Sequence, residues 1–457
     1  MDKMIDRFCA ALRIPTWWPA GALRGDSEAE APLRRFQDFL TERYPCFHQR
    51  AERWVLSPYS TIYRWPGRAA ASAAGGTEAS GVEGPVLILA HYDVVPVEKE
   101  KWRVDPFGAE QKDGYIYGRG ALDMKSILIA IMEAAETLCA GGFNPRHDIW
   151  FAFGGDEERA GIQGARETAK WFARRGQRFA WILDEGTPVG ENQIKGVDSP
   201  LALFSIEEKG FLSLELTVPQ KPGHASRPPK VQAVAVLSRA LCKIAKKPFP
   251  YKLVPTVENF FAQLASLSGG VQGFAMRHAR ALGGVFFKAV SGNPDIASLL
   301  HTTAAMTQLE GSAADNVMPS EVKAVINLRL LHPWTVEKAV GFIKKAIGDE
   351  RVNVRVHGLG TDPVPANPEH ARRAGPGWKE MEAALKAVYP GVPSLVFLMM
   401  AATDSRHYQA FADGIFRFSP HRLTPGEMGL IHGHDERISV ENLQRGFEFY
   451  SHLLGAL

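Results

Sequence analysis

The chain of 457 residues is longer than one ordinary hydrophobic core supports, so its length predicts two domains. Hydrophobic residues make up 45% of the chain and charged residues 23%, which is typical of soluble globular enzymes. The 53 basic and 50 acidic residues leave a net charge of +3, which gives no electrostatic argument for binding to nucleic acid or to an acidic membrane surface.

The N-terminal residues and the cysteines favour a reduced, cytoplasmic protein. Charged residues interrupt the apolar residues of Met1–Cys9, so this stretch does not predict a secretory signal, and no stretch approaches the length of a membrane span. The four cysteines lack the paired spacing of a thiolate zinc site or a disulfide framework. We therefore expect free thiols and a cytoplasmic location.

The first half of the chain alternates strand and helix patterns, which predicts a sheet covered by helices. Short apolar runs predict strands at 86–90, 149–153 and 180–183. The residues after Asp123 carry a helical apolar face that ends at Gly141. The stretch from Arg68 to Gly84, rich in Ala, Gly and Ser, has no periodicity and is expected to be a surface insertion.

The pattern changes from about Lys209 onward. It predicts a strand at 212–218, a helix at 231–244, strands at 302–309 and 322–331, a helix at 336–347 and a strand at 352–356. This order is that of a split β-α-β, ferredoxin-like arrangement. The α/β pattern then resumes at Trp378. We therefore expect a discontinuous α/β catalytic domain of residues 1–208 and 359–457, with a mixed sheet flanked by helices, and an inserted α+β domain of residues 209–358.

The segment from Phe260 to Leu300 is helical in pattern, interrupted by glycines and unusually apolar. Its aromatic residues include Phe260, Phe261, Phe274, Phe286 and Phe287. Packing within a helical core is the favoured interpretation of these side chains. Contact with an acyl chain or a partner subunit is the alternative.

Five acidic and histidine motifs occur in order along the chain, and three of them follow predicted strands. The motifs are His91-Tyr92-Asp93, Asp123-Met124-Lys125, Asp156-Glu157-Glu158, Asp184-Glu185-Gly186 and His432-Gly433-His434-Asp435-Glu436. Strand ends of open α/β sheets meet at one edge, where such folds place their sites. Imidazole and carboxylate groups are ligands for divalent metals, so the set predicts a hydrolytic site with a metal pair.

The roles within this set can be divided. Asp123 could bridge two ions, with the remaining ligands forming the pairs His91 with Asp184 and Glu158 with His432. Asp93 can accept the proton of the other imidazole nitrogen of His91 and so orient the ring. Glu157 remains free to act as a general base. Taken alone, each motif also has an interpretation without a functional site. Asp156-Glu157-Glu158, for example, could be the exposed start of a helix, where acidic side chains interact favourably with the helix dipole.

These residues resemble a known family. The passages that carry the resemblance are residues 91–97, 118–125, 153–158, 183–186, 208–210 and 432–438. They are similar to those of the dinuclear zinc metallopeptidases that include carboxypeptidase S, aminoacylase, glutamate carboxypeptidase and succinyl-diaminopimelate desuccinylase. The nearest branch is that of carboxypeptidase S and the N-fatty-acyl-amino-acid hydrolase/synthases. The resemblance implies a zinc-exopeptidase-like catalytic domain, two Zn²⁺ ions per subunit with Co²⁺ or Mn²⁺ as substitutes, and a homodimer formed through an inserted lid domain.

The resemblance also implies further site residues. His224 would reach the active site of the partner subunit and stabilise the oxyanion. Asn316 and Arg329 would recognise the substrate from the lid, and Arg406 would bind the substrate carboxylate through paired hydrogen bonds. The family places its last ligand at the position of His432 and not at His434.

We therefore expect a metal-dependent hydrolase that cleaves an amide bond beside a free α-carboxylate, of the carboxypeptidase or dipeptidase type. Hydrolysis or synthesis of N-acyl amino acids uses the same residues and stays open as the alternative. A catalytically silent binding or scaffold protein is less favoured, because the ligand set is complete and Glu157 accompanies it. The expected partners are a small peptide or an N-acyl amino acid, and not nucleic acid.

Overall fold

The computed structural model describes residues 1–19, 25–68, 84–191, 197, 199–373 and 375–457. The insertion expected from Arg68 to Gly84 therefore falls largely outside the described residues. The chain divides into two compact units: Met1–Ile206 with Asn367–Phe397 and Thr403–Leu457, and Glu207–Ala366 with Leu398–Ala402. The expected boundaries lie close to these. The sequence assigned Leu398–Ala402 to the catalytic domain, but the backbone amide of Lys209 donates to Met399 O at 3.0 Å and ties this segment to the second unit.

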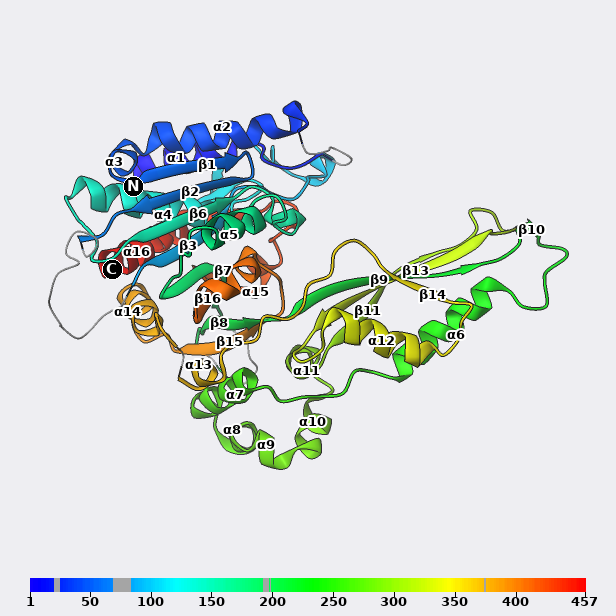
Figure 1. Ribbon diagram of the computed structural model, residues 1–457. Coiled ribbons are helices and arrows are strands. Elements are labelled where there is room, and N and C mark those ends of the chain that lie inside the picture. The colour runs from blue at the N-terminus through cyan, green and yellow to red at the C-terminus, as the bar shows by residue number, and fades with distance from the viewer. Residues whose placement is uncertain (20–24, 69–83, 192–196, 198, 374) are drawn as a thin grey trace. The chain divides into compact units, whose positions relative to one another are not determined.

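The first unit is built on an eight-stranded mixed sheet with the order β1-β2-β6-β3-β7-β16-β8-β15 (Figure 1). Its strands are β1 Glu52–Ser57, β2 Ser60–Trp65, β3 Val86–His91, β6 Ile149–Gly154, β7 Trp181–Gly190, β8 Ala202–Glu208, β15 Ser394–Met399 and β16 Gly414–Leu423. β3 runs parallel to β6 and β7, and β7 runs parallel to β16. Every residue of β3 and β6 is buried, which explains why both were continuous apolar runs in the sequence.

Helices cover both faces of this sheet. The helices of this unit are α1 Asp2–Leu12, α2 Ser27–Arg43, α3 Pro45–Arg50, α4 Lys125–Ala140, α5 Ala165–Ala173, α13 Pro368–Arg373, α14 Trp378–Val388, α15 Pro425–Met428 and α16 Val440–Gly455. Leu89 and Trp150 share a core with Phe172 of α5, whereas Phe151 contacts Phe47 of α3. Successive strand residues thus reach helices on opposite faces of the sheet.

A three-stranded sheet joins distant parts of the sequence. β17 Arg437–Ser439 pairs with β5 Tyr115–Tyr117, which pairs with β4 Gln111–Lys112. The backbone amide of Gly118 then donates to Glu436 O at 2.9 Å. This pairing brings the C-terminal histidine motif beside the loop that leads to Asp123.

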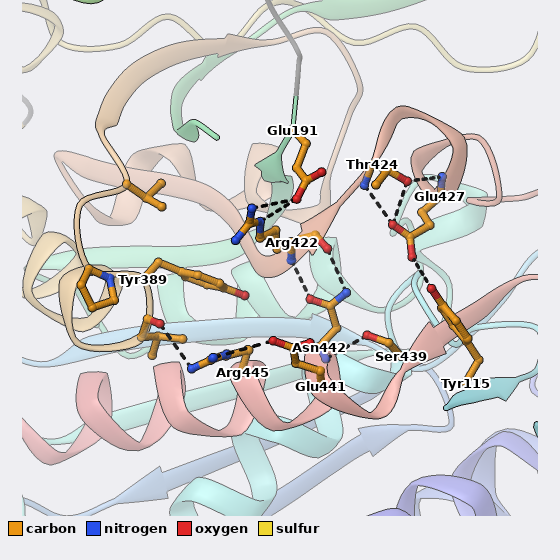
Figure 2. Close-up of a pocket in the computed structure, with 13 residues that line it drawn as sticks. Tyr115, Glu191, Tyr389, Arg422, Thr424, Glu427, Ser439, Glu441, Asn442 and Arg445 are labelled. Carbon is orange, nitrogen blue, oxygen red and sulfur yellow. Dashed lines mark hydrogen bonds and ion pairs between the residues drawn. The ribbon is translucent and has the colours of Figure 1, made fainter. Parts of the chain in front are cut away.

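A cavity of about 430 Å³ lies between α14, α16 and the end of β16 (Figure 2). Its charged side chains have partners. Arg422 pairs with Glu191 at 2.8 Å, Arg445 pairs with Glu441 at 3.7 Å, and Glu427 accepts a hydrogen bond from the hydroxyl of Tyr115 at 3.2 Å. The sequence predicted no site here, and no residue of the five motifs lines this cavity. We assign it no catalytic role.

The second unit contains an antiparallel sheet with the order β11-β13-β9-β14. Its elements are β9 Gly210–Pro219, α6 Ala233–Lys246, β11 Thr303–Glu310, β13 Glu321–Leu330, α12 Val336–Ile347 and β14 Asn353–Val356. This order of strands and helices is the predicted split β-α-β arrangement. The alternating apolar residues of β9 and β13 form one core with α6 and α12.

Five further helices stand between α6 and β11. They are α7 Pro255–Leu267, α8 Gly270–Arg277, α9 Ala279–Leu282, α10 Gly284–Val290 and α11 Pro294–Leu300. Phe260, Phe261 and Phe286 are buried among them, as the favoured interpretation expected, but Phe274 is 60% exposed. Within the described residues, no helix combines the length and the apolar character needed to cross a bilayer.

Candidate metal centre

The parallel strands deliver the predicted groups to one edge of the large sheet. β3 ends at His91, β6 ends just before Asp156, and Asp184 and Glu185 lie within β7. Parallel strands end on the same side of a sheet, so these side chains meet. The loop before α4 supplies Asp123, and the C-terminal motif supplies His432.

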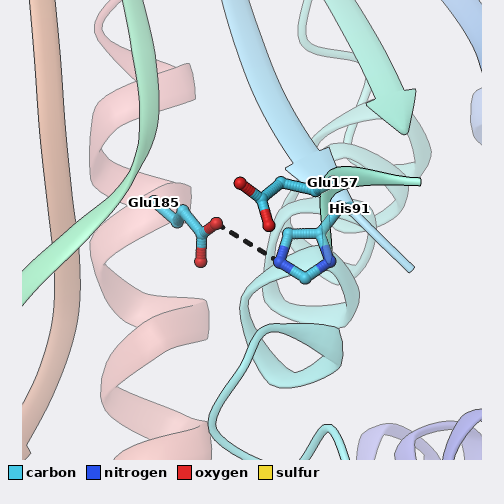
Figure 3. A group of neighbouring side chains, drawn as sticks. All are labelled: His91, Glu157 and Glu185. Carbon is cyan, nitrogen blue, oxygen red and sulfur yellow. Dashed lines mark ion pairs between the residues drawn. The ribbon is translucent and has the colours of Figure 1, made fainter. Parts of the chain in front are cut away.

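His91 lies among acidic side chains. Its Nε2 is 3.2 Å from Oε1 of Glu185, and the carboxylate of Glu157 faces the same ring (Figure 3). The potential ligand atoms of these three residues lie within 4.8 Å of one another.

Asp123 faces both predicted histidine ligands, with a different oxygen for each. Its Oδ1 is 3.0 Å from Nε2 of His91, and its Oδ2 is 2.9 Å from Nε2 of His432. Nε2 of His432 is also 3.2 Å from Oε1 of Glu158. His434 points elsewhere, with its Nε2 3.8 Å from Glu98. The placement of Asp123 between His91 and His432 is the geometry expected of a carboxylate that bridges two metal positions.

The placement of Asp184 differs from the expectation. Both of its oxygens accept backbone amides, Oδ1 from Glu185 at 2.9 Å and Oδ2 from Ser405 at 2.7 Å. The oxygen that faces His91 belongs instead to Glu185, which the sequence reasoning left without a role. Adjacent residues of a strand point to opposite sides, so only one of the two acids can face the imidazole. The sequence carried no signal for which one.

Asp93 supports two groups at once. Its Oδ1 is 3.3 Å from Nδ1 of His91, and its backbone carbonyl is 3.0 Å from the same nitrogen. Its two carboxylate oxygens also accept the backbone amides of Glu157 and Glu158, each at 3.1 Å. Asp93 thus lies where the sequence placed it, against His91, and in addition fixes the turn that carries the two glutamates.

Arg119 and Glu436 form a buried ion pair that the sequence reasoning did not identify. Nη1 of Arg119 donates to Oε2 of Glu436 at 2.7 Å, and Nη2 donates to the backbone carbonyl of His432 at 3.1 Å. Glu436 also accepts the backbone amides of Gly120, Leu122 and Asp123 at 3.0, 2.7 and 3.2 Å. The pair therefore connects the loop of the bridging aspartate to the loop of His432.

The cluster holds more carboxylates than cations. Hydrogen bonds to Asp123 and Glu158 raise the pKa of His432 to about 10. Burial raises the pKa of Glu185 to about 8 and that of Glu157 well above its usual range, and neighbouring acids add to both effects. Two divalent cations would neutralise this excess, and the imidazole and carboxylate donors are of the type that zinc-like metals bind. The residues therefore fit a metal pair.

Arg406 lies at this site. Its side chain is buried, and its Nη2 is 3.9 Å from Oε1 of Glu157. The other predicted substrate residues belong to the second unit.

Within the second unit, His224 and Asn316 lie side by side. His224 pairs with Val317 in the short ribbon of β10 Gly223–His224 and β12 Val317–Met318, and the amide of Ala225 donates to Asn316 O at 2.9 Å. Arg329 lies on β13, with its guanidinium 4.9 Å above the ring of Phe211. The roles of all three residues in catalysis stay predictions.

Comparison with known proteins agrees with the geometry. The family model described as peptidase family M20/M25/M40 matches residues 87–456. The N-fatty-acyl-amino acid synthase/hydrolase PM20D1 of Xenopus tropicalis is 30% identical over 455 residues, which cover 99% of this chain and 85% of the relative. The probable carboxypeptidase S-like 2 of Dictyostelium discoideum is 30% identical, over 93% of this chain and 79% of the relative.

The fold also has a solved counterpart. The M20 family metallo-carboxypeptidase Sso-CP2 of Sulfolobus solfataricus has a TM-score of 0.73 at 17% identity, with 100% of this chain and 99% of that chain covered. The family match and the two relatives agree with the cluster of potential metal ligands formed by His91, Asp123, Glu158 and His432. The chain belongs to the peptidase family M20/M25/M40 and is a metal-dependent hydrolase.

Proposed function

We propose that the chain hydrolyses an amide bond that adjoins a free α-carboxylate, with two zinc ions as the native metals and Co²⁺ or Mn²⁺ as substitutes. The observation that carries the proposal is the position of Asp123, whose two oxygens face His91 and His432 separately. N-acyl amino acids are the favoured substrates, because the Xenopus relative is named for them. Small peptides are the second candidate, supported by the carboxypeptidase S-like relative.

We assign the ligands from the geometry. Asp123 would belong to both positions, His91 and Glu185 to one, and Glu158 and His432 to the other. Glu185 takes the place that the motif predicted for Asp184. When bound, the metals would acidify the attacking water and polarise the scissile carbonyl.

The remaining groups move the proton and hold the substrate. Glu157 takes the proton of the attacking water and returns it to the leaving amine. Its buried carboxylate, which lies beside His91 and outside the assigned ligand set, supports this role. Arg406, next to Glu157, would bind the α-carboxylate through two parallel hydrogen bonds. His224 would stabilise the oxyanion, and Asn316 and Arg329 would select the substrate.

A homodimer forms part of the proposal. β11 lies at the edge of the sheet of the second unit, and nearly all of its residues are exposed, including Leu309 at 69%. An open edge strand presents unpaired backbone groups that a second copy can pair with. A cytoplasmic location also stays part of the proposal and rests on the sequence alone.

The test is a substrate panel assayed with metal-free protein to which Zn²⁺, Co²⁺ or Mn²⁺ is returned. The panel pairs dipeptides with N-acyl amino acids of increasing acyl length, and each substrate has a control with its α-carboxylate amidated. We expect turnover that needs metal, needs the free carboxylate and is greatest for N-acyl substrates. Turnover of dipeptides alone would favour the second candidate, and activity that survives chelation or amidation would refute the proposal.

A further inference from the structure

The helices α8 to α10 expose large apolar side chains to solvent. Val271 is 86% exposed, Phe274 60% and Val285 72%. Val271 and Phe274 are three positions apart on α8, so they lie on one side of that helix. Leu267, at the end of α7, is 37% exposed. Single exposed apolar residues are ordinary, but four within one short segment call for an explanation.

The exposed side chains are not needed for the core of this segment. Phe260, Phe261, Met276 and Phe286 are buried, and the rings of Phe261 and Phe286 lie 5.4 Å apart. The segment therefore has its own interior, and the four outward side chains are additional to it.

The same segment concentrates positive charge. No Asp or Glu occurs between Glu258 and Asp295, whereas Arg277, Arg280 and Lys288 do. Arg280 is paired with Glu258, with its Nε 2.5 Å from Oε1, while Arg277 and Lys288 are exposed. The whole chain has 53 basic and 50 acidic residues, so the residues outside this stretch balance at 50 and 50. The net charge of the whole chain is too small to predict binding to an acidic membrane surface. Its concentration in this one segment, however, favours such binding.

We propose that residues 267–288 are a docking surface for an anionic lipid bilayer. Val271, Phe274 and Val285 would enter the interface between headgroups and acyl chains, and Arg277 and Lys288 would meet the acidic headgroups. A second copy of the chain fits less well, because a two-fold contact through the same surface would bring Arg277 and Lys288 close to their own copies. The inference does not depend on which amide the enzyme cleaves.

The test is flotation of the full-length protein with vesicles of phosphatidylcholine alone and with vesicles of phosphatidylcholine and phosphatidylglycerol in equal parts. We expect binding to the anionic vesicles that weakens as salt is added. The double variant V271D/F274D should lose binding by about tenfold or more, because charged side chains resist transfer to the interface. R277Q/K288Q should lose the preference for anionic vesicles.

The matched control is Val55→Asp, which charges an apolar side chain that is 46% exposed on β1 of the first unit. This variant should bind vesicles like the wild type. Thermal unfolding checks the fold of every variant, and R277Q/K288Q gives a second test if V271D/F274D unfolds. Absence of wild-type binding, or equal loss in V55D and V271D/F274D, would overturn the proposal. So would conversion of a dimer to a monomer by V271D/F274D with vesicle binding unchanged.

Discussion

The choice between Asp184 and Glu185 shows what single residues contribute to this site. The two acids are adjacent in β7, yet Asp184 accepts two backbone amides while Glu185 faces His91. Asp184 therefore holds the turn at Ser405, and the adjacent carboxylate is available to a metal. Adjacent residues of a strand point in opposite directions. The structure therefore assigns a structural role to Asp184 and a ligand position to Glu185, which the sequence alone does not distinguish.

We predict that Glu185→Gln lowers metal affinity by about 10-fold to 100-fold or more, because it removes a charged ligand. Asp184→Asn is the matched variant. It should keep near-normal metal content but lose about 1–3 kcal/mol of stability, since its amide NH₂ would face a backbone N–H. Equilibrium dialysis followed by metal analysis measures the first effect and urea unfolding the second. Loss of metal in D184N together with normal metal content in E185Q would show that Asp184 is the ligand, as the motif predicted.

His421 gives a prediction about pH that is independent of the metal site. It is fully buried on β16, and burial lowers its pKa from 6.5 to about 3. The unfolded chain binds a proton below about pH 6.5, while the folded chain excludes it down to about pH 3. The stability that depends on the neutral ring is therefore fully present above about pH 6.5 and falls as the pH drops, by about 1.4 kcal/mol per pH unit.

Urea unfolding at a series of pH values between these limits tests this account. The wild type should lose stability on acidification more steeply than His421→Phe, whose ring cannot take up a proton. Parallel curves for the two proteins would show that His421 does not control the acid sensitivity.

At the scale of elements, the Arg119–Glu436 pair joins two loops that carry metal ligands. We predict that Glu436→Gln weakens metal binding by about 10-fold to 100-fold, because the amide NH₂ would oppose a donor of Arg119 or of the loop backbone. Calorimetric titration of the metal-free protein with Zn²⁺ measures this affinity and does not depend on an activity assay. Glu427→Gln, a change in the nearby α15 capping box, should leave metal affinity unchanged. Equal affinities for E436Q and the wild type would assign the pair to folding alone.

The elements differ in how far the sequence predicted them. β3 and β6 were predicted because both are buried along their whole length and appear as uninterrupted apolar runs. The pairing of β17 with β5 was not, because it joins residues 437–439 to residues 115–117 and no local pattern encodes such a contact. Glu436 belongs to the last motif, but no local pattern identifies Arg119 as its partner, because their contact depends on the same long-range pairing.

At the scale of the whole molecule, the sequence predicted two domains from length and pattern alone. It also predicted the order of strands and helices in the inserted unit, because each element there has a clear period. It did not predict the assignment of Leu398–Ala402 to the second unit, which depends on the contact between Lys209 and Met399. The proposed role of His224 makes catalysis depend on two copies of the chain, and this gives a direct test.

If His224 acts in the site of a partner subunit, two inactive variants should restore each other. Glu157→Gln lacks the base, and His224→Asn lacks the oxyanion donor, so each homodimer should turn over substrate at least about 100-fold more slowly than the wild type. In a mixed dimer, the site of the H224N subunit has its own Glu157 and receives His224 from the E157Q subunit. Random mixing makes half of the dimers mixed, each with one complete site of two, so activity should return to about a quarter of the wild-type value.

The measurement is the rate of hydrolysis after the two variants are unfolded together and refolded. Coexpression with different tags and purification through both leaves only mixed dimers, so that preparation should reach about half of the wild-type value. Each variant treated alone is the control for recovery of the fold. L309K, which places a charge on the exposed edge of β11, should convert the dimer to a monomer in light scattering and abolish the restored activity. A mixture as inactive as its parents would place His224 in the site of its own chain or outside catalysis. Full activity of H224N alone would remove it from the mechanism.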